Sequence, residues 1–237
     1  MIDWKGRCET LQQELLSLVH AVSHDLRAPL RAADGFSRVL LTRHSAELDP
    51  QALDYLQRIR AATALMGSHI DALTRLARAA TAEVRPAQVD LAAIARSSVD
   101  QLRDAEPERQ VEVRIADGLE VQGDPALLRL LMQILVSNAW KFTAKHPGAT
   151  IEVGRKQEGD GVAYFVRDTG AGFDMAFAKH LFEPFGRLHP ESDYPGVGIG
   201  LAIARRIINR HGGRLWAEAA PDQGATFWFT FGALEHE

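Results

Sequence analysis

Apolar residues recur at alternating spacings of four and three along two stretches of the first third of the chain. The first stretch places them at Leu11, Leu15, Leu18, Val22 and Leu26, and the second, which includes one threonine, at Leu56, Ile59, Thr63, Met66, Ile70, Leu73 and Ala77. This spacing is the period of a helical seam that packs against other helices, and it predicts two long helices. His44–Asp49 forms a short connection, and Asp49 followed by Pro50 supplies a cap and a first helical position.

The first 82 residues are therefore expected to form a helical hairpin. Two helices of this length bury only one seam each. A second hairpin from another copy of the chain would complete a four-helix bundle, so we predict a homodimer.

The helical periodicity is lost between Thr81 and Asp90, where Pro86 lies, and residues 83–90 are expected to be a linker. Residues 91–237 mix two kinds of pattern. Helices are predicted over 91–102, 125–142 and 199–211, and strands over 111–115, 151–155, 162–167 and 225–231. The two central strands form a hairpin across Gly159-Asp160-Gly161. This order predicts an α/β sandwich, in which one mostly antiparallel sheet is covered by helices on one face.

Composition narrows the classes of function. The chain has 46% hydrophobic and 24% charged residues, which excludes disorder. Its 27 Lys and Arg residues against 31 Asp and Glu residues argue against a surface built to hold nucleic acid or anionic lipid. Cys8 is the single cysteine, which excludes an internal disulfide and fits a reducing compartment. The sequence contains no run of about 18 apolar residues that could cross a bilayer, so we expect a cytoplasmic protein.

The first chemical feature is His24, which lies about 200° around the helix from Val22 and so points away from the packed seam. The same outer stripe carries His20, Arg27 and Arg31, and Asp25 is the next residue. A carboxylate that holds the ring proton makes the other nitrogen a better nucleophile, and arginines suit an incoming phosphoryl group. A plain solvated face is the alternative. Pro29 favours a functional site, because a proline inside a helix costs about 3 kcal/mol and needs a reason such as a bend beside a working residue.

A second feature lies on the predicted helix 125–142. Its inward stripe is Leu128, Leu131, Leu135, Asn138 and Phe142, so an amide stands where the periodicity asks for an apolar side chain. A buried amide without a partner costs about 1–3 kcal/mol. Asn138 is therefore either bonded to neighbouring backbone or a ligand for Mg²⁺ and phosphate oxygen, with Lys141 one turn further along.

Two glycine-containing turns follow. In DTGAGF, residues 168–173, the glycines let the backbone pass close to a ligand, although a purely structural turn fits the same letters. In GVGIGLAIA, residues 196–204, three alternating glycines stand before a helix whose N-terminus favours a triphosphate. Residues 175–195, which include LFEPFGRLH, are too long for a simple connection and are expected to form a lid.

These strings, in this order and spacing, resemble the kinase core of sensor histidine kinases of two-component systems, above all the kinase modules of bacteriophytochrome-type sensors. SHDLRAPLR, residues 23–31, resembles the phosphoacceptor motif, and SNAWKFT, residues 137–143, resembles the asparagine motif. Phe182 and Phe185 match the phenylalanine motif. The resemblance spans about residues 22–231. It implies a dimeric helical bundle followed by a Bergerat-type α/β-sandwich ATP-binding domain.

The resemblance also implies roles for individual residues. His24 is the implied phosphoacceptor and Asp25 its acid/base neighbour. Asn138 is the implied Mg²⁺ ligand, Lys141 a triphosphate contact, and Asp168 the acceptor of a hydrogen bond from the adenine amino group. The other residues implied to form the nucleotide site are Gly170, Gly172, Arg187, Gly196, Gly198, Gly200, Leu201, Gly224 and Thr226. For Arg187 a plain surface role fits equally well.

The expected function is that of a histidine autokinase that uses ATP and Mg²⁺, phosphorylates His24 and passes the phosphoryl group to an aspartate of a response regulator. An upstream sensor is expected, either as a domain of a longer protein or as a separate protein docked through the first helix. The alternative is a dimeric ATP-binding scaffold without transfer activity, which Ile134 favours because the family often has another asparagine there. Ala28 stands where regulator-dephosphorylating members often have Thr or Asn, so weak phosphatase activity is expected.

Overall fold

The computed structural model describes residues 4–81, 84–159, 161–190 and 192–232. The chain divides between Thr81 and Ala82 into an N-terminal unit and a C-terminal unit, each compact by itself. Within the described residues, no helix is both long enough and apolar enough to cross a membrane.

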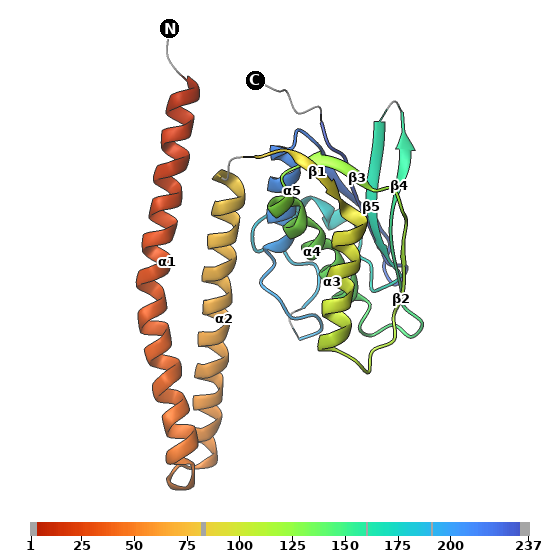
Figure 1. The fold of residues 1–237 in the computed structure, drawn as a ribbon. Helices are drawn as coiled ribbons and strands as arrows, with labels where there is room; N and C mark the ends of the chain where they lie inside the picture. Colours follow the sequence, from red (N-terminus) through yellow and green to blue (C-terminus); the bar gives the residue numbers. More distant parts are fainter. Residues whose placement is uncertain (1–3, 82–83, 160, 191, 233–237) are drawn as a thin grey trace. The chain divides into compact units, whose positions relative to one another are not determined.

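The N-terminal unit is a helical hairpin, as predicted (Figure 1). It consists of α1 (Trp4–Arg43), the short 3-10 helix η1 (Ser45–Glu47) and α2 (Pro50–Thr81). The backbone N–H of Ala52 donates to Asp49 Oδ1 at 2.7 Å, so Asp49 caps α2 through its side chain. The connection therefore begins and ends where the sequence places it.

The buried side chains of the two helices are mostly small or polar. They are Ser23 and Ser37 on α1, and Thr63, Ile70, Ala72, Thr74, Ala77 and Ala79 on α2. Of the predicted α1 seam, Leu18 remains 61% exposed and Val22 48% exposed within the hairpin. The apolar stripe of α1 is thus not covered by α2, and it stays available to another helix pair.

The described residues of the C-terminal unit form two sheets and three α-helices. Its elements are β1 (Ala87–Asp90), α3 (Leu91–Ala105), β2 (Glu112–Ile115), β3 (Glu120–Gly123), α4 (Pro125–Phe142), β4 (Thr150–Glu158), β5 (Gly161–Asp168), η2 (Met175–His180), α5 (Gly200–Arg210), β6 (Leu215–Ala219) and β7 (Ala225–Phe229). The predicted helices and strands are all present with ends shifted by a few residues. The strands β1, β3 and β6 were not predicted, and β1 occupies half of the segment expected to be a linker.

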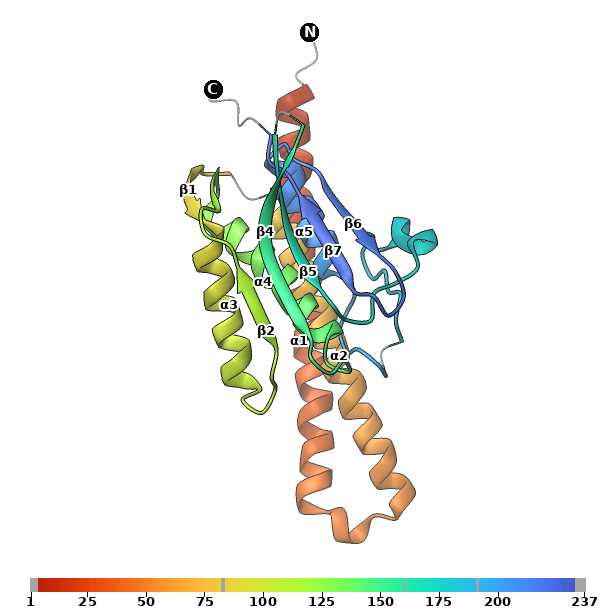
Figure 2. The ribbon, with the colours of Figure 1, turned by 90° about the vertical axis from the view of Figure 1, so that its right-hand side faces the viewer.

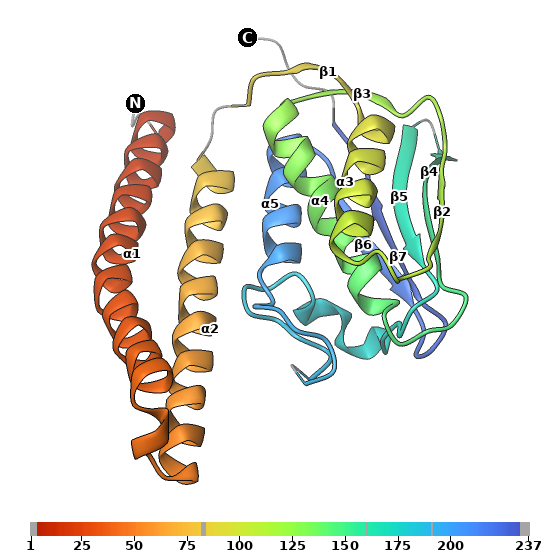
Figure 3. The same ribbon diagram turned by 60° about the horizontal axis from the view of Figure 1, so that its bottom comes forward.

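The main sheet has the order β2-β4-β5-β7-β6, and β1 pairs with β3 in a separate two-stranded sheet. All neighbours in the main sheet are antiparallel except β2 and β4, which are parallel. Helices α3, α4 and α5 cover one face of this sheet (Figures 1 and 3), and Figure 2 looks onto the opposite face. The unit is therefore the expected sandwich of one sheet and one helical layer.

Helix α4 lies at the centre of this layer. Asp124 caps it, because its Oδ1 accepts from the backbone N–H groups of Ala126 and Leu127 at 2.9 and 3.0 Å. Leu128, Leu131 and Leu135 are completely buried along its inward stripe. This packing fixes the rotation of α4 and so fixes where its last two turns present polar side chains.

Candidate functional site

His24 lies on α1 with its side chain 82% exposed, as the helical geometry predicts. Its Nδ1 is 3.2 Å from Oδ1 of Asp25, whose side chain is equally exposed. A carboxylate accepts hydrogen bonds, so in this pair Nδ1 carries the proton and Nε2 keeps its lone pair. The ring therefore offers Nε2 to solvent as a nucleophile.

Pro29 lies five residues after His24, and α1 continues through it as a helix. Proline has no backbone N–H, so the carbonyl of Asp25 loses the donor that would normally bond it one turn later. The proline thus alters the hydrogen bonding of the helix at the residue that holds the His24 ring.

One of the cationic side chains on the same stripe as His24 already has an acidic partner within the hairpin. Arg27 Nη2 donates to Oδ1 of Asp71 on α2 at 2.8 Å, so this guanidinium already has a carboxylate partner. His20 and Arg31 are exposed. The prediction that Arg27 awaits a phosphoryl group is therefore modified, because Arg27 also joins the two helices.

Asn138 is half-buried on the last two turns of α4. Within the described part of the chain, its side-chain amide makes no hydrogen bond to another residue. This geometry does not support the structural alternative, in which the amide would be bonded to neighbouring backbone. One turn earlier, Ile134 lies against the start of α5, since its Cγ2 is 3.2 Å from the place a Cβ on Gly200 would take.

Lys141 is half-buried one turn after Asn138. Burial, together with the positive charge of Arg187, lowers the pKa of Lys141 to about 8. Its Nζ lies 4.2 Å from the centroid of the Phe142 ring and 3.4 Å from the place a Cβ on Gly196 would take. The ammonium group therefore faces the glycine run of residues 196–200, where it would meet an anion.

Asp168 ends β5 and is only 3% exposed. Burial raises the pKa of Asp168 to about 6, although the backbone N–H groups of Gly170 and Ala225 hydrogen-bond to the carboxyl and lower it. The bond from the Gly170 N–H to Oδ1 measures 2.9 Å. A buried carboxylate fixed in this way can accept a hydrogen bond from a ligand in a defined direction.

The turn after Asp168 passes close to two other segments. Gly172 has φ +54°, and a Cβ there would lie 1.9 Å from the carbonyl oxygen of Ala220. A Cβ on Gly170 would lie 2.4 Å from the carbonyl oxygen of Phe142 at the end of α4. The turn of residues 168–173 therefore lies against the end of α4, which carries the motif of residues 137–143. Only glycine at positions 170 and 172 permits the backbones to approach this closely.

Thr226 does not take the place that the resemblance implied. Asp168 pairs with Ala225 across β5 and β7, and neighbouring side chains on a strand point to opposite faces. The Thr226 hydroxyl accepts a hydrogen bond from Arg167 Nε at 3.1 Å instead. Its side chain thus lies on the face away from Asp168, and Ala225 is the β7 residue beside the carboxyl.

The glycine run leads into α5, which begins at Gly200 and carries the half-buried Leu201 in its first turn. Gly198 has φ +75°, and a Cβ there would lie 2.8 Å from the carbonyl oxygen of Gly186. Arg187 donates to the carbonyl oxygen of Tyr194 at 3.0 Å and to that of Gly196. The guanidinium therefore shapes the loop before the glycine run. Gly224, with φ +81°, lies directly against the carbonyl oxygen of Asp168.

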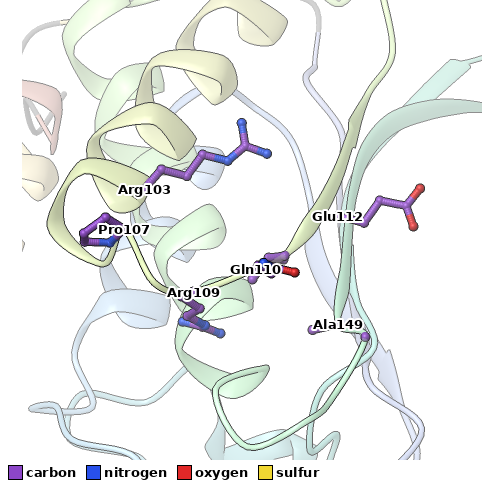
Figure 4. A pocket seen from close by; sticks show the side chains of 8 residues that line it. Arg103, Pro107, Arg109, Gln110, Glu112 and Ala149 are labelled. Carbon is purple, nitrogen blue, oxygen red and sulfur yellow. The ribbon is translucent and has the colours of Figure 1, made fainter.

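A separate hollow of about 560 Å³ lies between the end of α3 and the start of β2 (Figure 4). None of the residues that line it is a predicted site residue. Arg109 at its edge donates to Thr143 Oγ1 at 2.8 Å and covers the Trp140 ring at 4.6 Å. Arg109 therefore supports the end of α4 from behind. No group of three or more His, Cys, Asp or Glu residues with metal-binding spacing occurs in the described ranges.

Two family models match the chain. Residues 14–82 match the His Kinase A (phospho-acceptor) domain, and residues 123–234 match the histidine kinase-, DNA gyrase B-, and HSP90-like ATPase family. The two matches cover most of the chain in the order in which the two units occur.

Individual relatives agree with these models. The chain is 29% identical over 222 residues to phytochrome-like protein Cph1 of Synechocystis, a match that covers 94% of this chain and 30% of Cph1. It is 33% identical over 227 residues to the methanogenesis regulatory histidine kinase FilI of Methanothrix harundinacea, covering 95% of this chain and 25% of FilI. The crystal structure of full-length ShkA in complex with AMPPNP superposes with a TM-score of 0.64 at 26% identity, covering 92% of this chain and 47% of ShkA. The chain thus spans less than a third of the length of Cph1 and of FilI.

Proposed function

Because the chain belongs to the histidine kinases, with a phospho-acceptor domain followed by an ATPase domain, we propose that it transfers the γ-phosphoryl group of ATP to His24. The observation that carries this proposal is the pairing of an exposed imidazole with Asp25 in one unit and a glycine-lined site around Asp168 and Lys141 in the other.

The nucleotide is proposed to bind where α4, the turn after Asp168 and the glycine run meet. Asp168 accepts a hydrogen bond from the adenine amino group, because its carboxyl is buried and held by backbone N–H groups. Lys141 meets the phosphates beside Gly196, and the N-terminus of α5 adds backbone donors.

The described residues fit Mg²⁺ as a partner of the phosphates rather than as an ion held by protein alone. The Asn138 amide has an oxygen that is not used by another described residue, and the chain offers no acidic cluster in those ranges. Asn138 would hold the ion together with phosphate oxygens, and the ion would supply neutralisation of the charge on the leaving group.

The proposed transfer is an in-line displacement. Nε2 of His24 forms a bond to the γ-phosphorus while the bond from that phosphorus to the bridging oxygen of ADP breaks, and ADP carries away the electron pair. The ring becomes positively charged at this step. Asp25 stabilises that charge through Nδ1–H until this proton leaves to solvent, which yields phosphohistidine with an uncharged ring and an anionic phosphoryl group.

The homodimer and the partners also belong to this proposal. The exposed apolar residues of α1, among them Leu18 and Val22, form a face that a second hairpin would bury in a four-helix bundle. The phosphoryl group is proposed to pass from His24 to an aspartate of a response-regulator receiver domain. An upstream sensor is proposed to regulate the kinase, since the chain covers 30% of Cph1 and 25% of FilI.

Incubation of the purified chain with radiolabelled ATP and Mg²⁺ tests the proposal. Label that is acid-labile and base-stable is expected in the wild-type chain and in His20→Gln, but not in His24→Gln. His20 is a matched control, because it is an exposed histidine one turn earlier on the same helix. Undiminished label in His24→Gln, or none in the wild type, contradicts the proposal. Mixing His24→Gln with Asp168→Asn then shows whether transfer occurs between subunits, because only transfer between subunits restores label.

A second candidate function is an ATP-binding dimeric scaffold without phosphoryl transfer. It is favoured by Ile134, which places an apolar side chain against the start of α5 where the family often has an amide. The same assay separates the two, since a scaffold binds nucleotide but leaves His24 unlabelled.

A further inference from the structure

Three aromatic rings join the lid segment, residues 175–195, to the end of α4. Phe142 is the last residue of α4, while His189 and Tyr194 belong to the lid segment. The centroid of the Phe142 ring lies 5.4 Å from that of His189 and 5.0 Å from that of Tyr194. The His189 and Tyr194 centroids are 5.3 Å apart. Tyr194 is only 7% exposed. These three residues, called the lid cluster below, are packed at distances typical of favourable aromatic pairs.

His189 also connects this cluster to the turn after Asp168. Its Nε2 lies 2.8 Å from the carbonyl oxygen of Gly172. A carbonyl only accepts, so Nε2 carries the proton and donates. The backbone of the same turn is bonded to α4 as well, because the Ala171 N–H donates to the carbonyl oxygen of Phe142 at 3.1 Å. One side chain of the lid segment is therefore tied to two of the three segments that form the proposed nucleotide site.

The other end of the lid cluster is anchored by charge. Lys145 Nζ binds Asp193 Oδ1 at 2.7 Å and lies 5.2 Å from the centroid of the Tyr194 ring. The Tyr194 carbonyl accepts from Arg187, whose guanidinium also bonds to Gly196. Figure 3 shows the lid segment at the end of the helical layer where α4 ends and α5 begins. The bonds from Arg187 thus hold the backbone at Gly196, where the glycine run begins.

We propose that His189 is a positioning residue for the nucleotide: through its bond to Gly172 and its packing on Phe142 it holds the lid segment in register with the turn after Asp168. This inference rests on the proposed function. Ordering a loop during binding weakens affinity, and a contact that orders it beforehand restores that affinity. His189 acts on nucleotide affinity rather than on the chemical step, because its contacts within the described residues are with Gly172, Phe142 and Tyr194, and none of these takes part in the proposed transfer.

Substitutions at His189 test this role. His189→Leu keeps an apolar group of similar size but removes the donor, whereas His189→Gln keeps an N–H donor at the end of the side chain. Tyr194→Phe keeps the ring, and serves as the matched control within the same cluster. Each variant is compared with wild type by titration with a fluorescent ATP analogue, by the KM and kcat of His24 phosphorylation, and by thermal unfolding.

We expect His189→Leu to weaken nucleotide binding and raise KM by about tenfold, with kcat at saturating ATP within about twofold of wild type. His189→Gln is expected to recover most of the affinity, and Tyr194→Phe to keep it. Wild-type affinity in His189→Leu, or equal loss in the Leu and Gln variants, overturns the inference. If His189→Leu is too unstable to measure, Tyr194→Leu must show the same rise in KM with unchanged kcat.

The two proposals fail in different ways. A wild-type chain that binds the fluorescent nucleotide without labelling His24 contradicts the proposed function, while the affinities alone still decide the role of His189. A wild-type chain that binds no nucleotide contradicts both.

Discussion

The Ser23 hydroxyl oxygen lies 3.2 Å from that of Thr74, and this bond between buried hydroxyls joins α1 to α2 one residue before His24. Thr74 donates its own proton to the carbonyl oxygen of Ile70 at 2.9 Å. A hydroxyl has a single proton, so Ser23 must be the donor in the pair. The order of donors is therefore fixed, and the two partners are not equivalent.

This asymmetry predicts the effect of removing each partner. Thr74→Val leaves the buried Ser23 hydroxyl without its acceptor and is expected to cost about 1–3 kcal/mol of unfolding free energy. Ser23→Ala leaves Thr74 bonded to Ile70 and is expected to cost about 1 kcal/mol or less. The double variant should be more stable than Thr74→Val alone. Urea unfolding followed by helical circular dichroism, at one protein concentration, measures all three, and equal costs for both single variants contradict the assignment.

Asp168 links nucleotide binding to stability. Burial raises its pKa from the ordinary value of 3.8 to about 6, so between these pH values the folded chain keeps a proton that the unfolded chain has lost. Stability therefore falls as pH rises through this window, by about 3 kcal/mol at neutral pH. Asp168→Asn removes this cost. We expect Asp168→Asn to unfold at a higher temperature than wild type at pH 7.5, with the difference vanishing near pH 4.

The same substitution is expected to abolish nucleotide binding, because an amide N–H₂ would face the adenine amino group donor to donor. A gain in stability together with a loss of affinity separates a binding role from a structural one. A lower unfolding temperature for Asp168→Asn at pH 7.5, or unchanged affinity in a nucleotide titration, would show that the carboxyl serves the fold.

Lys141 sets the alkaline limit of nucleotide binding. Burial and the charge of Arg187 lower its pKa to about 8, so the free chain loses this positive charge as pH rises above that value. Phosphate prefers the charged form, and affinity is therefore expected to fall steadily above about pH 8 and to be unaffected by this group well below it. Lys141→Arg keeps its charge throughout and should flatten the fall. Titrations with a fluorescent ATP analogue from pH 6.5 to 9.5 compare the two, and parallel curves contradict the prediction.

The long elements were predictable because their signals are local. Apolar spacing and the capping pairs at Asp49 and Asp124 mark α2 and α4 closely. Strands β1 and β3 have four residues each, and each contains a single valine as its only large apolar residue, so neither shows the apolar alternation that predicted β2. They form because they pair with each other across 30 residues of sequence, and no local signal reports such a pairing.

The apolar seam of the hairpin shows a second limit of prediction from sequence. Periodicity identifies the apolar stripe of α1 but does not say which neighbour covers it. Val22 is 48% exposed, whereas the adjacent Ser23 is buried against Thr74. Two hydroxyls that satisfy each other can pack between helices as well as apolar side chains do, so a polar residue at a contact position breaks no physical rule.

The site residues were predictable where a motif requires a particular backbone conformation. They were less predictable where their role depends on the face of a strand to which the side chain points. Gly170 and Gly172 lie where only glycine fits, as their motif suggested. Thr226 was assigned from its motif alone, although a strand pairing of Asp168 with Ala225 turns the threonine to the opposite face. His211 gave no signal: it is fully buried, donates to the Ile207 carbonyl and accepts from the Asp124 N–H, and so ties α5 to the cap of α4.

Asn138 offers the sharpest separation of ligand binding from folding. Its amide makes no hydrogen bond to another described residue, so Asn138→Ala removes no bond from the fold and is expected to change the unfolding temperature little. If the amide oxygen holds Mg²⁺ beside the phosphates, the same variant loses the part of nucleotide affinity that depends on Mg²⁺, while Asn138→Asp, which keeps an oxygen ligand, retains part of it. Ser137→Ala is the matched control, because the hydroxyl of this exposed neighbour donates to the Ile134 carbonyl at 3.1 Å and to no other described residue. Nucleotide titrations with Mg²⁺ and with EDTA measure the effect, and an Asn138→Ala chain that still responds fully to Mg²⁺ rules out this amide as the ligand.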